Sequence, residues 1–248
     1  SPLPQPRKKP LQPGGAKESE LISYLDHTIR NVKGRWAKRM FKDEEVEQGE
    51  AHGYHSFGEA AHDIDGLVDV VWVSGSPNLQ VPYLLSIALL MTDFLPDFPP
   101  APQATFRVLD KLDHAFSSLL QGKDSDTGEP LPGFESGRNI STTDKVRLKS
   151  IVERTRLIVV EALSGESREE ESMDIDDEFR AEASETELSK SESENDDTVK
   201  FEGFDDFDSD EEDDDDREEL HIAKVYERTI GELGDVLGGP PIGIITDD

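Results

Sequence analysis

Three phenylalanines are evenly spaced within the most acidic part of this sequence. The stretch TVKFEGFDDFDSDEEDDDD (198–216) places aromatic rings among carboxylates at steps of three residues. Burying one such ring contributes about 1.5–3 kcal/mol, and carboxylates steer a segment toward a basic surface. Because disordered acidic segments are normally poor in aromatic residues, the pattern predicts a protein-binding segment rather than a solubilising tail. The residues expected to make the contact are Phe201, Phe204, Phe207, Asp205, Asp206 and Asp208.

Five serines of the same region have the sequence context of phosphorylation sites. Ser209 is followed by Asp-Glu-Glu, which resembles a casein kinase II site. Four more have an acidic residue three positions further on, namely Ser184, Ser189, Ser191 and Ser193. Each phosphate would add about −1.5 to −2 charges. Phosphorylation is therefore expected to deepen the negative charge of the binding segment.

Histidines are the other candidates for chemistry. His52 and His55 lie in a glycine-containing loop, with His62 and Asp63 downstream. They could bind a metal in principle, but their spacing matches none of the usual zinc-ligand patterns, so a metal-dependent enzyme is the weakest hypothesis. The sequence has no cysteine, which excludes disulfides, thiolate catalysis and cysteine-held metals. We expect no catalytic residue, no metal and no cofactor, and we predict that the protein is not an enzyme.

Charge is distributed very unevenly along the chain. The formal net charge is −30. Residues 1–165 contain 19 Lys or Arg against 23 Asp or Glu, a net of −4, whereas residues 166–248 contain 7 against 33, a net of −26. Nucleic-acid affinity depends on Lys and Arg neutralising phosphates, so direct binding of nucleic acid is not expected. The natural partners are basic proteins.

The apolar segments are short. The longest apolar run, 81–91, falls below the roughly 20 residues that cross a bilayer. The amino-terminal stretch also lacks the layout of a signal peptide. No membrane association is expected.

The elements that must position these residues are helices, because apolar side chains recur every three or four positions. The third predicted helix is apolar on nearly all sides and should be the central, buried one. The fourth should end at Gly122, a natural C-cap. No stretch alternates as a strand would. The predicted fold class is all-α, a bundle of about five helices at 17–42, 56–74, 79–94, 103–121 and 141–163.

The fifth predicted helix is unusually basic for an acidic protein. It begins in STTD, which supplies hydroxyl N-cap candidates and an acidic residue near the helix N-terminus. Its outer residues form either a docking surface for a partner or an anchor for the chain's own acidic segment, and both are favoured over a nucleic-acid site. The candidate docking face consists of Lys145, Arg147, Lys149, Arg154 and Arg156.

Four regions follow from these patterns. Residues 1–16 are rich in proline and glycine and should be disordered, and their PRKKP motif fits either a nuclear-import signal or a solvated basic tail. Residues 17–165 form the helical domain. Residues 166–217 have the composition of a disordered acidic segment. Residues 218–248 hold a last helix, to about residue 237, which either packs on the body or folds when it meets a partner.

The body resembles a fungal family of small subunits of the general transcription and repair factor TFIIH. The resemblance covers about 21–163 and is carried by VPYLL, FPPAP and the helix KLDHAFSSLL, followed by STTDKVRLKSIVERTR. It implies a nuclear protein that associates with TFIIH and promotes release of the Ssl2/XPB-type translocase subunit. It supplies no residue-by-residue site.

The acidic segment carries a second resemblance. FEGFDDFDSDEED is similar to ligands of the pleckstrin-homology domain in a TFIIH core subunit, which makes Phe204 and Phe207 the expected anchors. The leading hypothesis is a non-enzymatic TFIIH adaptor, active in transcription and nucleotide excision repair, which binds through its helical body and its acidic-aromatic segment. The alternative is an acidic chaperone of histones or of other basic nuclear proteins.

Overall fold

The described part of the chain is built from helices. The computed structural model describes residues 2–40, 52–135, 137, 139–163 and 220–237. No β-strand occurs in these ranges, apart from one isolated bridge between Lys123 and Pro130. The all-α prediction is confirmed. In chain order the helices are α1 (Ala16–Ala37), α2 (Phe57–Val73), α3 (Pro77–Phe94), the short 3-10 helix η2 (Leu95–Asp97), α4 (Pro102–Gln121), α5 (Thr142–Leu163) and α7 (Glu227–Leu237).

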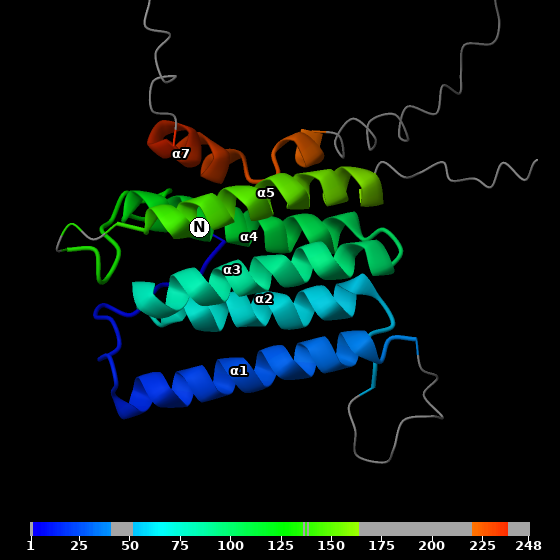
Figure 1. Ribbon diagram of the computed structural model, residues 1–248, viewed down its shortest axis with the longest axis horizontal. Coiled ribbons are helices and arrows are strands. Elements are labelled where there is room, and N and C mark those ends of the chain that lie inside the picture. The colour runs from blue at the N-terminus through cyan, green and yellow to red at the C-terminus, as the bar shows by residue number, and fades with distance from the viewer. Residues whose placement is uncertain (1, 41–51, 136, 138, 164–219, 238–248) are drawn as a thin grey trace, which may run out of the picture.

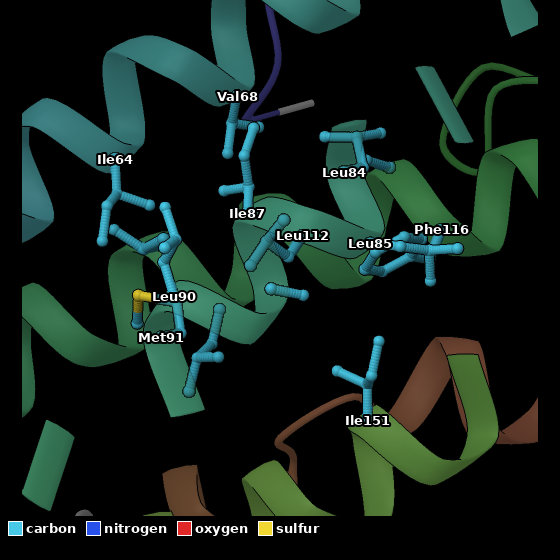
Figure 2. Packing of buried hydrophobic residues seen from close by; sticks show 14 of the residues in the cluster. Ile64, Val68, Leu84, Leu85, Ile87, Leu90, Met91, Leu112, Phe116 and Ile151 are labelled. Atoms are coloured by element: carbon cyan, nitrogen blue, oxygen red, sulfur yellow. The ribbon is translucent and has the colours of Figure 1, made fainter. Parts of the chain in front are cut away.

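The helices stack with α1 at one edge and α7 at the other (Figure 1). α3 packs against both α2 and α5, and α2 also packs against α4. Side chains of α3 meet those of α2 and α4 in the core, where Ile87 and Leu90 lie near Ile64 and Leu112 (Figure 2). The prediction that the third helix is central is confirmed, because α3 is buried on most of its surface.

The apolar character of α3 extends further than the run 81–91. Pro77–Asp97 has a mean hydropathy of 1.4 and is long and apolar enough to cross a membrane by length and composition, but 61% of it is buried inside the protein. The protein interior therefore covers most of this apolar surface, as expected for the core helix of a bundle.

The helix ends follow local sequence signals. Ser56 caps α2, since its side chain accepts a hydrogen bond from the backbone N–H of Glu59. The hydroxyl of Ser141 accepts one from the N–H of Asp144 at the start of α5, and it donates to the carboxylate of the same residue. Gly122 adopts the left-handed conformation at the end of α4, as predicted.

The proline-rich segment 2–15, expected to be disordered, has no helix but lies against the bundle. Leu3 and Leu11 are 8% and 7% exposed. The N–H of Leu11 donates to the hydroxyl of Ser76 at 2.7 Å, and the N–H of Arg7 donates to the carbonyl of Val73 at 3.2 Å. The proline and glycine content predicted disorder, whereas burial of these two leucines ties the segment to the bundle.

The predicted last helix is interrupted. A helical turn at 220–223 is followed by a break, and α7 begins only at Glu227. Tyr226 adopts a φ of 57° at the break, which is uncommon for a residue other than glycine. Both parts pack on the body, with α7 against α4 and α5 (Figure 1). Of the two alternatives left open by the sequence, the structure shows the packed one.

Candidate protein-docking surface

A carboxylate on α4 determines where α7 begins. Asp113 accepts hydrogen bonds from the backbone N–H groups of Thr229 at 2.8 Å and Arg228 at 3.2 Å. The hydroxyl of Thr229 donates to the carbonyl of Asp113, and the guanidinium of Arg228 donates to Asp110. Asp113 thus acts as the N-cap of a helix that lies 116 residues further along the chain.

Burial has the largest effect on the pKa values of the groups where α7 meets α4. It raises the pKa of Asp113 above its ordinary value, even though hydrogen bonds from Thr229 and Arg228 and the charge of Arg228 favour the carboxylate. Tyr226 is also buried beside it, with its ring 6.3 Å from that of Phe116, and burial raises the pKa of its hydroxyl. That hydroxyl has no hydrogen-bond partner among the described residues. Docking α7 therefore buries polar groups as well as apolar ones.

Docking of α7 creates a groove between α7 and α5. Its volume is about 460 Å³. Val152 of α5 and Leu233 of α7 are nearly fully buried there, while Ile230 is 37% exposed. The remaining lining residues are Lys149, Glu153, Arg156 and Gly234. The result is an apolar floor with charged residues at its rim.

A row of exposed apolar side chains runs along α5 beside the groove. Val146, Leu157 and Val160 are 55%, 66% and 44% exposed. At 100° per residue they occupy one narrow face of the helix. Glu153 lies on the same face and approaches Lys149 at 3.9 Å. We call the groove and this row together the α5–α7 surface.

The five predicted cations of α5 lie on both sides of this row. Lys149 and Arg156, seven residues apart, line the groove on the α7 side. Arg147 and Arg154 are also seven residues apart and fall on the opposite flank, where Arg154 contacts Asp93 at 3.5 Å. Lys145 is partly buried near the start of the helix. The structure divides these cations into two flanks with an apolar row between them.

The residues of the acidic binding segment lie outside the described residues. This holds for Phe201, Phe204, Phe207, Asp205, Asp206 and Asp208, and for the serines Ser184, Ser189, Ser191, Ser193 and Ser209. Their place in the chain is nevertheless informative. Leu163 at the end of α5 is buried, and so are Val225 and Tyr226 just before α7. In the sequence, the acidic segment therefore lies between two elements that pack on the body.

The histidine loop forms no metal centre in the described part of the chain. Within those ranges no group of three or more His, Asp or Glu residues could hold a metal ion. The backbone carbonyl of His52 accepts a hydrogen bond from Arg35, whose guanidinium also pairs with Asp63 at 2.7 Å. His62 lines a small polar pocket with Asp65 and Arg107. These contacts join helices α1, α2 and α4.

Sequence reasoning left two parts of the surface incomplete. In the KLDHAF stretch a capping or tertiary polar role is the default for Asp113, but the sequence does not show which distant N–H groups approach its carboxylate. Ile230 and Leu233 are apolar residues of the predicted last helix, but the sequence does not show that they form one wall of a groove. Their helical spacing was the available signal, since an apolar face must be covered by something.

Comparison with known proteins identifies the family. A model of the TFB6 family, described as subunit 11 of the general transcription factor TFIIH, matches residues 53–234. The chain belongs to the TFB6 family. The match includes α2 to α5 and most of α7, and so contains every residue lining the groove. It begins after α1, whereas the sequence resemblance was placed at about 21–163.

A second comparison found a similar protein. An uncharacterized protein of Schizosaccharomyces pombe is 30% identical over 151 residues, which cover 59% of this chain and 80% of that protein. No solved structure shows significant similarity to the chain. Membership of the TFB6 family indicates a role as a TFIIH subunit.

Proposed function

We propose that this chain is a non-enzymatic regulatory subunit of TFIIH that acts in the nucleus, in transcription and in nucleotide excision repair. It binds other subunits through its helical body and its acidic-aromatic segment, and it promotes release of the translocase subunit. The observation that carries the proposal is the TFB6 family match over residues 53–234. The α5–α7 surface supports it, because exposed apolar side chains flanked by charges are typical of protein interfaces.

The non-enzymatic part of the proposal is supported by how the buried charges are used. The ammonium of Lys111 lies 2.9 Å from Asp65 and 2.8 Å from Asp69. Arg107 also contacts Asp65 at 3.1 Å, so two cations balance two carboxylates between α2 and α4. Asp113 is engaged in capping α7. These charged groups therefore have structural roles, and none needs a substrate to explain its position.

The two binding regions would act together. The acidic segment is joined in the chain to elements that border the α5–α7 surface, so the two binding regions are covalently linked. Such linkage makes the second contact intramolecular and raises the overall affinity without new contacts. A subunit with two linked contacts could hold the core of TFIIH with one and displace the translocase with the other.

Affinity purification from the native cell tests the proposal. The tagged full chain should recover TFIIH subunits at stoichiometric levels, and the recovered complexes should contain less translocase than complexes purified from cells lacking the chain. Recovery of histones without any TFIIH subunit would contradict the proposal.

One observation favours the second candidate, a chaperone of histones or other basic nuclear proteins. It is the net charge of −26 in residues 166–248. The two functions respond differently to changing Phe204 and Phe207 to Ala, which leaves the charge unaltered. An adaptor should lose most of the affinity of its acidic segment, whereas a chaperone's affinity should follow charge and salt concentration.

A further inference from the structure

We propose that the α5–α7 surface is the docking site for an acidic amphipathic helix of a partner protein. The proposal deepens the proposed function and rests on it only for the identity of the partner. The surface itself is defined by the geometry of α5 and α7.

The first argument is the concentration of exposed apolar side chains at this place. Among the described residues nine large hydrophobic side chains are exposed, and four of them belong to this surface. The others are scattered over different elements and need no explanation. The four are Val146, Leu157, Val160 and Ile230. They lie beside the apolar floor of the groove, with Lys149 and Arg156 between the row and the groove, and such exposed apolar surfaces mark interaction sites.

The second argument is the shape of the surface. The row from Val146 to Val160 runs along α5 for about 21 Å, at 1.5 Å per residue. A groove between two helices, with an apolar row beside it, fits the apolar face of a third helix that supplies anchors at steps of three, four and seven residues. The groove of about 460 Å³ can accept a bulky anchor between Val152 and Leu233.

The third argument is charge complementarity. Lys149 and Arg156 flank the apolar row on one side, and Arg147 and Arg154 flank it on the other. Arg147 and Arg156 form no ion pair with a described residue, and the Arg154 pair with Asp93 is exposed and long at 3.5 Å. These cations are therefore available to a ligand. A helix with carboxylates on both sides of its apolar face would meet a basic flank on each side.

Glu153 fixes one further property of the partner. It is 65% exposed and lies within the apolar row, where it approaches Lys149 at 3.9 Å. A carboxylate directly opposite would be repelled. The partner helix should therefore carry a neutral polar or basic residue at this level, about midway along its apolar face.

Titration of the full chain with a labelled synthetic peptide tests the proposal. The probe is an acidic helix of about 18 residues, long enough to span the row, with leucines on one face, glutamates on both flanks and a central glutamine. A scrambled peptide of the same composition is the reference. The wild-type chain should bind the helical probe about tenfold more tightly or better, because only that probe presents a continuous apolar face.

Two pairs of surface variants locate the site. Leu157→Asp with Val160→Asp, and Lys149→Glu with Arg156→Glu, should each weaken binding about tenfold or more, because they remove apolar anchors or reverse the rim charge. The matched controls are Tyr24→Asp and the pair Arg30→Glu with Lys33→Glu, all exposed on α1, and these should bind as the wild type does. Circular dichroism confirms that every variant is folded. If the surface variants bind the probe as tightly as the controls do, the proposal is wrong.

Two other occupants would be recognised in the same experiments. If changing Phe201, Phe204 and Phe207 to Ala strengthens probe binding about tenfold, the chain's own acidic segment occupies the surface, and the partner proposal is wrong. If sedimentation shows a wild-type dimer that Leu157→Asp with Val160→Asp abolishes, the occupant is a second copy, which also overturns it. The purification experiment and the peptide titration test different proposals. If the tagged chain recovers no TFIIH subunit but still binds the probe, the proposed function is refuted and the proposed docking site is not.

Discussion

The carboxylate of Asp113 on α4 caps the first turn of α7 and accepts the N–H of Thr229 at 2.8 Å. A second bond comes from the N–H of Arg228 at 3.2 Å. Tyr226, immediately before α7, has a φ of 57°, in the left-handed region, so the helical turn at 220–223 does not continue into α7. The position of α7, and with it one wall of the groove, therefore depends on a side chain from a distant helix.

Replacing Asp113 with Ala should release α7 from the body. The change leaves the N–H groups of Thr229 and Arg228 without an acceptor, and loss of a cap costs about 0.5–2 kcal/mol. Amide hydrogen exchange should accelerate across 225–237 by about tenfold while α3 is unaffected, since 1.4 kcal/mol corresponds to a factor of ten.

Asp110→Ala is the matched control for this cap. Asp110 pairs with Arg228 on the surface, where both side chains are about half exposed. An exposed pair contributes about 0–1 kcal/mol, so exchange in α7 should change much less than in Asp113→Ala. Equal acceleration in the two variants would show that the tertiary cap does not hold α7.

The raised pKa of Asp113 predicts how the stability of docked α7 changes with pH. Burial in the docked state raises this pKa above its ordinary value of 3.8, so docking favours the protonated form. The part of the docking free energy that is linked to protonation of Asp113 is therefore fully present below the ordinary pKa and is lost as pH rises through the raised one, while the two N–H hydrogen bonds to its carboxylate remain. Asp113→Asn keeps an acceptor oxygen but cannot ionise.

Unfolding of both proteins measured at several pH values checks this sign. The free energy of unfolding of the wild type, relative to Asp113→Asn, should decrease as pH rises from below 3.8 through the raised pKa. A difference that is constant with pH, or that changes in the opposite direction, would show that the hydrogen bonds outweigh burial.

Local sequence signals predicted the helices well, and long-range contacts explain what they missed. Apolar spacing located α2 to α5 within a few residues, and Gly122 ends α4 as its type suggests. The break before α7 was not predicted, and the carboxylate that caps the helix after it, Asp113, lies 116 residues away in the sequence. The packing of Leu3 and Leu11 could not be predicted either. Composition describes the segment as a whole, whereas two buried side chains are what hold it against the bundle.

The same reasoning applies to the docking surface. The basic residues of α5 were predicted from the sequence, but their division into two flanks depends on which face of the helix the body covers. The groove exists because α7 packs on the bundle beside α5, although the acidic segment separates these two helices in the sequence. Periodicity predicts that an apolar face will be covered, but it does not identify the element that covers it.

Lys111 should be the most sensitive charged residue of the body. Its side chain is 10% exposed and lies between Asp65 and Asp69. Lys111→Met leaves two carboxylates without their shared cation, and breaking a buried pair costs about 3–5 kcal/mol. Urea denaturation followed by circular dichroism measures this loss.

Two comparisons test the Lys111 prediction. Arg107→Met removes an arginine that also contacts Asp65 but is 66% exposed, so it should cost less than about 1 kcal/mol. Adding Asp65→Leu to Lys111→Met should restore part of the stability, because the uncompensated charge is then removed. A similar loss in Lys111→Met and Arg107→Met would rule out a special role for the buried ammonium.

Trp36 should hold the end of α1 to the body. Its ring stacks on that of Phe94, with centroids 4.9 Å apart and an angle of 11° between the planes. Its indole N–H donates to Asp97 at 2.9 Å, and Arg39 lies over the ring while it pairs with the same carboxylate. Trp36→Phe keeps an aromatic ring and loses one hydrogen bond, which costs about 1 kcal/mol. Trp36→Ala also loses the stack and should cost at least about 2 kcal/mol.

The loss in the Trp36 variants should be local because α1 packs mainly against α2. Hydrogen exchange should therefore accelerate in α1 and stay slow in α3, with a larger effect for Trp36→Ala than for Trp36→Phe. Probe binding at the α5–α7 surface, on the other side of the bundle, should be unchanged in both. Unfolding of α1 together with α3 would show that α1 is an integral part of the core and would contradict this prediction.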